Sequence, residues 1–189
     1  MALHIAILGW GSLLWDKVSS FDDQHDEWEL NGPELKIEFS RISKTRAGAL
    51  TLVIDPVNGA ACRVAHTRSH RLTQEDAIYD LRSREGTTRA NIGFYFSDGS
   101  AHQSRDQATL DAIRAWTLTN TVDVVVWTDL APNFEKTCGC SYALPSAMEH
   151  LLALDSAALA GATEYLKLAP EFVVTPLRDA WNSRPIVTR

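Results

Sequence analysis

The sequence predicts an α+β fold in a single domain that spans residues 1–189. Period-two alternation of apolar side chains dominates the first half, which is typical of strands with one buried face. Helix-capping patterns followed by helical periodicity dominate the second half. These strands and helices do not alternate regularly, which disfavours a doubly wound sheet and favours a closed or half-closed sheet with helices outside it. No repeat or linker divides the chain.

The first half of the chain contains four expected strands. Residues 3–8 form a short apolar run, and residues 35–39 alternate apolar and charged side chains. Residues 49–54 and 61–65 flank the turn formers at 55–59, among which an Asn-Gly pair tolerates positive φ. The last two strands are therefore expected to pair as a hairpin.

A helix is predicted over residues 72–86. Thr73 and Asp76 have the spacing of a capping box at its start, and Gly86 suits the position just after its end. This places Glu85 in the last turn.

The remaining elements follow from the same signals. They are a strand at 91–96, a helix capped by Ser104 with Gln107, a strand at 122–127, helices at 145–154 and 156–168, and an irregular tail. The valine run of the strand at 122–127 indicates burial on both faces.

The composition of the chain narrows the classes of function to be considered. The net charge is -6, with pI near 5.5, so nucleic acid is not an expected partner. Three cysteines do not suggest a disulfide framework, and no apolar stretch is long enough to span a membrane. The N-terminal run lacks a basic segment and reads as a strand, not a signal peptide. We expect a cytoplasmic protein.

The first candidate site is the glycine-serine segment at residues 9–15. Leu14 stands where a dinucleotide fingerprint or a nucleophile elbow needs glycine, and no P-loop lysine follows, so Ser12 is not an expected nucleophile. A tight turn with free N–H groups suits carboxylate or carbonyl oxygens. The alternative interpretation is an ordinary turn that closes a strand.

Glu85 is the second candidate. A carboxylate at a helix C-terminus faces the negative end of the helix dipole, which raises its proton affinity and suits a general base. The positive charges of Arg82, Arg84 and Arg89 would lower the proton affinity of the carboxylate instead. The direction of its net pKa shift depends on which guanidinium lies close to it. A solvated helix end is the alternative.

A metal or thiol site has weaker support. Cys138 and Cys140 are separated by one glycine, without a second cysteine pair or a suitably spaced histidine pair for zinc. We therefore expect no metal site, and structural or incidental thiols.

Three segments in order resemble the gamma-glutamylcyclotransferase-like family, with the ChaC-type branch closest. They are Gly9-Trp10-Gly11-Ser12-Leu13-Leu14-Trp15, the stretch from Phe39-Ser40-Arg41 to Leu50-Thr51-Leu52, and Leu81-Arg82-Ser83-Arg84-Glu85. They cover about the first two-thirds of the chain. The resemblance implies a small mixed β-barrel with surrounding helices.

The resemblance also implies roles for particular residues. Trp10, Gly11, Ser12 and Leu13 would hold the gamma-glutamyl part of a small-molecule substrate, and Glu85 would be the general acid/base. No cofactor is implied, because the α-amine of the substrate attacks its own γ-carbonyl. Trp10 departs from the usual tyrosine of the family. Tyr165 is a possible counterpart of the family's C-terminal tyrosine, without an assigned role, and residues 126–134 match no known role.

Three functional hypotheses result. The first is a cofactor-free gamma-glutamylcyclotransferase-type lyase that forms 5-oxoproline and releases an amine or peptide. The second is a non-catalytic module that binds a small carboxylate or amide through the loop at residues 10–13. The third is a redox role for Cys138 and Cys140.

Overall fold

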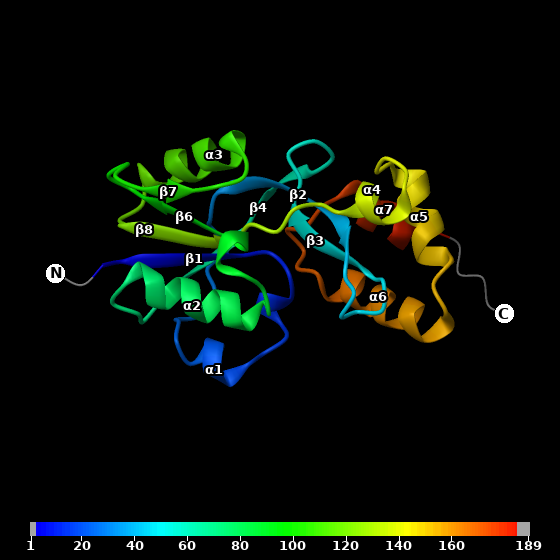
Figure 1. Cartoon of the computed structure of the whole chain (residues 1–189), viewed down its shortest axis with the longest axis horizontal. Coiled ribbons are helices and arrows are strands. Elements are labelled where there is room, and N and C mark those ends of the chain that lie inside the picture. Colours follow the sequence, from blue (N-terminus) through cyan, green and yellow to red (C-terminus); the bar gives the residue numbers. More distant parts are fainter. Residues whose placement is uncertain (1–2, 185–189) are drawn as a thin grey trace.

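Two β-sheets form the centre of the molecule, and helices lie around them (Figure 1). The computed structural model describes residues 3–184. The five-stranded sheet has the order β5 (Ala65–Arg68), β1 (Ile5–Gly9), β8 (Val124–Thr128), β6 (Ile92–Phe96) and β7 (His102–Gln103). The three-stranded sheet has the order β3 (Leu50–Ile54), β2 (Glu34–Ile42) and β4 (Ala60–Arg63). Among the described strands only β1 and β8 pair in parallel, so the α+β class is confirmed.

The helices divide between the two sheets. In chain order they are η1 (Ser12–Leu14), α1 (Ser19–Asp22), α2 (Gln74–Arg84), η2 (Arg89–Asn91), α3 (Gln107–Thr117), α4 (Phe134–Cys138), α5 (Leu144–Leu152), α6 (Ser156–Leu168) and α7 (Pro176–Ser183). In Figure 1, α1, α2 and α3 lie around the five-stranded sheet, and α4 to α7 gather at the other end. The smaller sheet therefore lies between these two groups.

Strands β1 and β8 bury both of their faces. Ile7 and Val126 pack in a cluster with α1 and α2, whereas Leu8 and Val125 pack in a larger cluster. That larger cluster also contains residues of β2, β3, α3, α6 and α7. The two-sided burial expected from the valine run is confirmed, because alternate side chains supply two separate cores.

The predicted helix before Glu85 is confirmed, including its caps. The side chain of Thr73 accepts a hydrogen bond from the backbone N–H of Asp76 at 3.2 Å. At the other end Gly86 has φ of 57°, which favours glycine. The expected helix at 156–168 is α6 with the same bounds.

The expected β-barrel does not form. Within residues 3–184, hydrogen bonds group the strands in two sheets, and no edge strand of one sheet pairs with an edge strand of the other. The sheets contact each other through side chains of the shared core instead.

The expected hairpin between β3 and β4 is also wrong. Both strands pair with β2, β3 along residues 37–42 and β4 along residues 34–37, so they lie on opposite edges of it. The turn at residues 55–59 crosses over β2, where a Cβ on Gly59 would lie 2.7 Å from the carbonyl carbon of Lys36. Gly59 is needed for this close approach, and its φ is not among the positive values.

Two further expectations are corrected. The predicted irregular tail contains α7, whose Leu177 and Trp181 are buried and whose N-cap is Thr175 before Pro176. The N-cap of α3 is Asp106, not Ser104, because the Asp106 carboxylate accepts the backbone N–H of Thr109 at 2.6 Å.

Candidate functional site

A cavity of about 410 Å³ lies where the two sheets meet. One wall comes from the loop after β1 and the end of α2, and the other from β2, β3 and the loop between them. The lining residues are Trp10 to Leu13, residues 41–46, residues 51–53, residues 84–87, Thr128, Leu130, Asn133 and Tyr165. Segments far apart in the sequence therefore form one site, which includes all five residues proposed from the sequence.

The glycine-serine loop makes a sharp turn where it lines this cavity. The backbone N–H of Leu14 donates to the carbonyl of Gly11 at 3.0 Å, which closes a short 3-10 turn. The first N–H groups of such a turn have no partner within it, so they are suited to bind a ligand oxygen. Trp10 and Leu13 are buried on opposite sides of the loop, in the two different cores.

Glu85 is the C-cap of α2 and lines the same cavity. The N–H of Gly86 bonds to the carbonyl of Ser83, and the N–H of Thr87 bonds to the carbonyl of Arg82, which is a Schellman motif. Burial raises the pKa of the Glu85 carboxyl, while the nearby charges of Arg84 and Arg46 oppose that rise. The net direction is upward, so the carboxyl can exchange protons nearer to neutral pH.

The arginines near Glu85 in sequence point in different directions. Arg84 donates to the backbone carbonyls of Ser12 at 3.2 Å and Asp16 at 2.5 Å, which ties α2 to the glycine-serine loop. Arg89 instead pairs with Glu75 at 3.1 Å, away from the cavity lining. Of the three arginines considered from sequence, only Arg84 is among the causes that shift the pKa of Glu85.

Arg46 was not identified from the sequence, and it completes the basic side of the cavity. It lies in the loop between β2 and β3, with a guanidinium nitrogen 3.4 Å from the Asp16 carboxylate. Arg84 reaches the same carboxylate at 3.8 Å. The run Lys44-Thr45-Arg46 between two strands of an acidic protein was a signal that could have indicated it.

Tyr165 of α6 enters the cavity from the helical end. Its ring packs edge-on against Trp15, with centroids 5.3 Å apart, and the Arg46 guanidinium carbon lies 4.9 Å from its centroid. A Cβ on Gly11 would be 3.1 Å from the Tyr165 hydroxyl, so glycine there lets the loop approach the phenol. Burial raises the pKa of Tyr165 to about 12, which keeps a neutral hydroxyl at the site.

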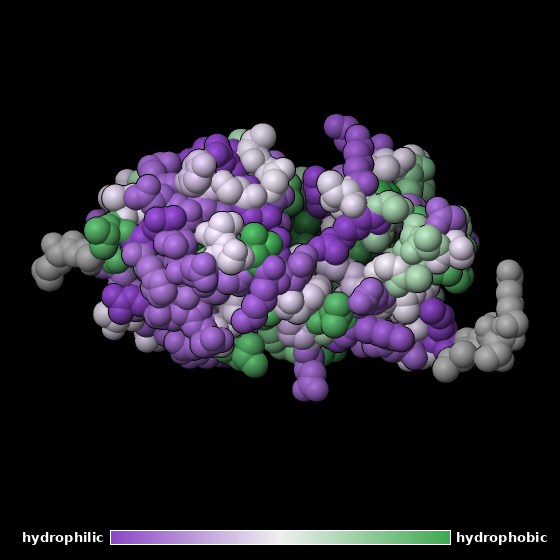
Figure 2. Space-filling view, turned by 90° about the horizontal axis from the view of Figure 1, so that it is seen from below, coloured by the Kyte–Doolittle hydropathy of each residue, from purple (hydrophilic) through white to green (hydrophobic). Residues whose placement is uncertain are grey.

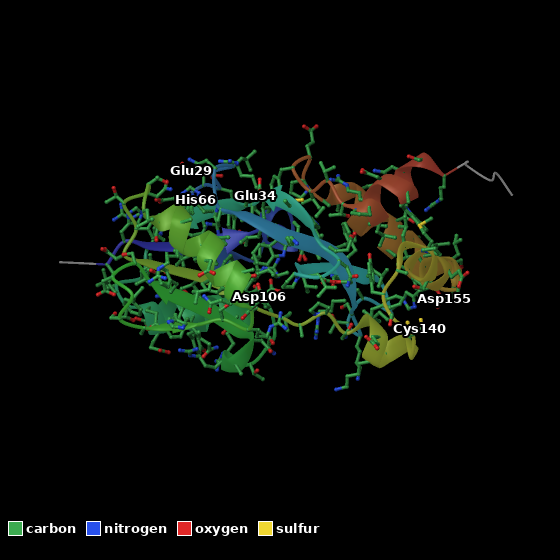
Figure 3. All side chains as sticks on the ribbon, turned by 90° about the horizontal axis from the view of Figure 1, so that it is seen from above. Glu29, Glu34, His66, Asp106, Cys140 and Asp155 are labelled. Atoms are coloured by element: carbon green, nitrogen blue, oxygen red, sulfur yellow. The ribbon has the colours of Figure 1, made fainter. Side chains whose placement is uncertain are left out.

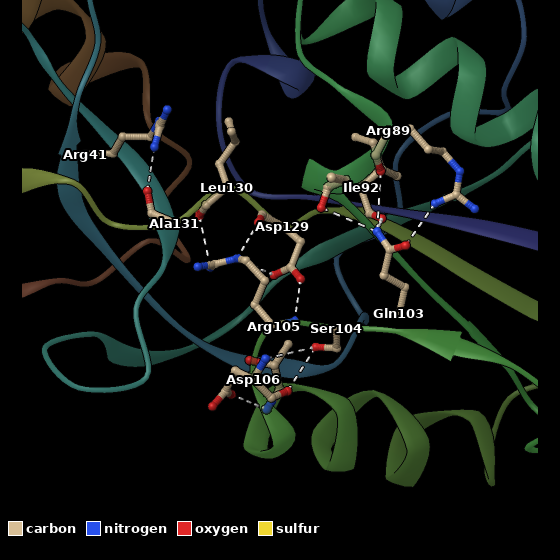
Figure 4. Close-up of polar contacts among 12 residues, drawn as sticks. Arg41, Arg89, Ile92, Gln103, Ser104, Arg105, Asp106, Asp129, Leu130 and Ala131 are labelled. Carbon is tan, nitrogen blue, oxygen red and sulfur yellow. Dashed lines mark hydrogen bonds and ion pairs between the residues drawn. The ribbon is translucent and has the colours of Figure 1, made fainter.

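Residues 126–134, unexplained by sequence, connect the two sheets (Figure 4). After β8, Arg105 donates to the carbonyls of Asp129 and Leu130, and Arg41 donates to that of Ala131. Asn133 then bonds to both the N–H and the C=O of Ile42, at 2.7 Å and 3.1 Å. This segment lies along the part of β2 that β4 leaves uncovered, and Thr128, Leu130 and Asn133 from it contribute to the cavity lining.

The cysteine pair lies outside the cavity lining. Cys138 and Cys140 are exposed free thiols, and Figure 3 shows Cys140 at the end of the molecule built by the C-terminal helices. Cys138 Sγ is 3.6 Å from His150 Nδ1. Among the residues that the structure describes, no three His, Cys, Asp or Glu side chains form a group that could hold a metal ion.

The face in Figure 2 is mainly hydrophilic over the five-stranded sheet, with more hydrophobic residues over the C-terminal helices. Across residues 3–184, no helix is long and apolar enough to cross a membrane. The chain matches none of the protein-family models compared with it, and no curated protein matches it either.

Proposed function

We propose that this protein is a cofactor-free gamma-glutamylcyclotransferase-type lyase, with Glu85 as the general acid/base. The observation that supports this most is the position of Glu85: a carboxyl whose pKa is raised by burial lines the same cavity as the glycine-serine loop. We also propose that the two packed sheets correspond to an opened form of the small barrel of this family.

The reaction requires one proton carrier and a held substrate. The α-amine nitrogen of a gamma-glutamyl group forms a bond to its own γ-carbonyl carbon, and the Glu85 carboxylate accepts a proton from that nitrogen. The γ C–N bond then breaks, and Glu85 returns the proton to the departing nitrogen. The products are 5-oxoproline and a free amine, so atoms and charges balance without a further reactant.

The surrounding residues supply binding and orientation. The loop at residues 11–13 lines the cavity, and its backbone N–H groups would donate to the carbonyl oxygen as it develops negative charge, a contribution typically of about 3 kcal/mol. Arg46 and Arg84 supply positive charge for the α-carboxylate of the substrate, since they flank the loop. The neutral Tyr165 hydroxyl, beside Gly11, can donate a hydrogen bond to the substrate.

The test is mass-spectrometric detection of 5-oxoproline after incubation with gamma-glutamyl amino acids, amines and glutathione. We expect the wild type to form product and Glu85→Gln to lose about 10²-fold or more of the rate, the range for a general acid/base. Glu75→Gln is a matched control that should keep the wild-type rate, because this exposed carboxylate lies on the same helix but outside the cavity lining.

Two outcomes would contradict the proposal. Full turnover by a folded Glu85→Gln variant would remove the base from the mechanism. A wild type that forms no product, but whose melting temperature rises with an unchanged donor, would instead support a non-catalytic binding module.

A further inference from the structure

Arg41 is directed by an irregularity in β2. The register of β2 with β3 shifts between Glu38 and Arg41, which marks a bulge, and bulges commonly redirect a side chain. The Arg41 guanidinium lines the cavity and is partly buried. Figure 4 shows its guanidinium Nη1 donating a hydrogen bond to the carbonyl of Ala131, at 2.6 Å.

Arg41 forms no ion pair within the described part of the chain, unlike its neighbour Arg105. Among the described residues, no carboxylate oxygen lies within 4.0 Å of its guanidinium, whereas the neighbouring Arg105 is paired with Asp129 at 3.5 Å. Burial and the charge of Arg105 both lower the pKa of Arg41. A partly buried guanidinium beside a second cation carries an electrostatic cost. An anion that enters the adjoining cavity reduces this cost, so binding of an anion is favoured.

The other cavity arginines differ in this respect. Arg46 and Arg84 share the carboxylate of Asp16, and both lie around the loop where the gamma-glutamyl group is proposed to bind. Arg41 belongs to β2, and its guanidinium donates to Ala131 in the segment after β8, so the Asp16 carboxylate does not hold it. With the gamma-glutamyl group at the loop beside Arg46 and Arg84, Arg41 is the remaining arginine of the cavity lining that is free to contact the departing amine.

We infer that Arg41 is a specificity-determining residue that selects gamma-glutamyl donors whose departing amine carries a carboxylate. This inference rests on the proposed function and narrows it: amino acids and peptides are preferred leaving groups, and neutral or cationic amines are poor ones. A guanidinium and a carboxylate form a paired, charge-assisted hydrogen bond in a partly buried site, which an uncharged leaving group cannot supply.

The test compares two donors that differ only at this group, gamma-glutamyl-alanine and gamma-glutamyl-alaninamide. Wild type, Arg41→Gln, Arg41→Lys and Arg63→Gln are assayed for 5-oxoproline formation with both. Arg63 is an exposed residue of β4 outside the cavity lining, so its variant carries the same change in charge. Melting temperatures verify that each variant is folded, and Arg41→Lys retains the charge if Arg41→Gln is unstable.

We expect Arg41→Gln to lower kcat/KM for gamma-glutamyl-alanine by about 10- to 100-fold, the range for a hydrogen bond to a charged group. The lower kcat/KM should result mainly from a higher KM. Turnover of the alaninamide donor should change less than about twofold, because the variant removes no interaction with it. Arg41→Lys should retain part of the preference, and Arg63→Gln should leave both donors unchanged.

An equal loss with both donors, or a wild type that does not distinguish them, would overturn the assignment of Arg41. The proposed function fails separately, if the wild type converts neither donor. Calorimetric binding of the two donors then still decides the assignment: tighter binding of the acid by wild type but not by Arg41→Gln supports it, and equal binding overturns it.

Discussion

Replacing Gly93 with alanine should destabilise the protein through one contact. Gly93 of β6 is the registered partner of Trp127 of β8, and the Trp127 side chain is fully buried. A Cβ on Gly93 would lie 2.5 Å from Cζ2 of the indole ring. This is about 1 Å or more inside the favourable carbon–carbon separation, and a fully buried ring has little room to move.

Overpacking of this kind costs about 2–3 kcal/mol when neighbours cannot adjust. For a chain of this length, that corresponds to a fall of about 4–12 °C in melting temperature. Urea denaturation followed by tryptophan fluorescence measures the free energy of unfolding directly. The m-value should remain unchanged, since the substitution does not alter the surface exposed on unfolding.

Gly161→Ala is the matched control for the same chemical change. Gly161 lies within α6, is exposed, and has nothing within 4 Å of an added Cβ. Alanine there should stabilise the protein by about 0.5–1 kcal/mol through helix propensity. A Gly93→Ala protein as stable as the wild type would refute the packing argument. Destabilisation by Gly161→Ala would show that the helix geometry is wrong.

Three further predictions concern Glu38, Asn133 and Cys138. Burial raises the pKa of Glu38 from 4.5, so the folded state binds its proton more tightly, and stability should fall as pH rises from about 4.5 through the raised pKa. Glu38→Gln should flatten this fall in denaturation curves recorded across pH; an unchanged slope would contradict it. Asn133→Ala should cost about 2–4 kcal/mol in denaturation, because it leaves both backbone groups of Ile42 without these partners, and a loss under 0.5 kcal/mol would exclude that role. His150→Ala should slow iodoacetamide labelling of Cys138, because the imidazole Nδ1 no longer accepts a hydrogen bond from the thiol. Peptide mass spectrometry with Cys140 as internal reference measures the rates, and equal rates would show that the contact has no effect.

The sequence predicted local structure well where one signal dominated. The cap at Thr73 and the glycine at Gly86 defined α2, because side-chain and backbone geometry at helix ends depends on a few neighbouring residues. Asn58-Gly59 indicated a hairpin that does not form, since a turn signal does not specify which strands pair on either side of it. The β2 strand lies between β3 and β4, and this pairing depends on contacts across the whole sheet.

The candidate site was predicted in part for similar reasons. The loop and Glu85 were found by ordered motifs, and the structure brings them to one cavity. Arg46 and Asn133 were missed because their roles depend on distant partners, Asp16 and Ile42. The direction of the Glu85 pKa shift depends on the burial of the carboxyl and on the position of Arg84. Neither can be read from the local sequence spacing.

Both sheets contribute walls to the cavity. A bound ligand therefore stabilises the packing of the two sheets against each other, and with it the whole fold. A ligand that contacts Glu85 on α2 and Arg41 on β2 at once binds only while the two sheets are packed together. At a concentration 100 times its Kd, such a ligand would stabilise the assembled state by about 2.7 kcal/mol. Slower amide hydrogen exchange should then extend to Ile42, where the connecting segment holds the sheets, beyond the residues that the ligand itself contacts.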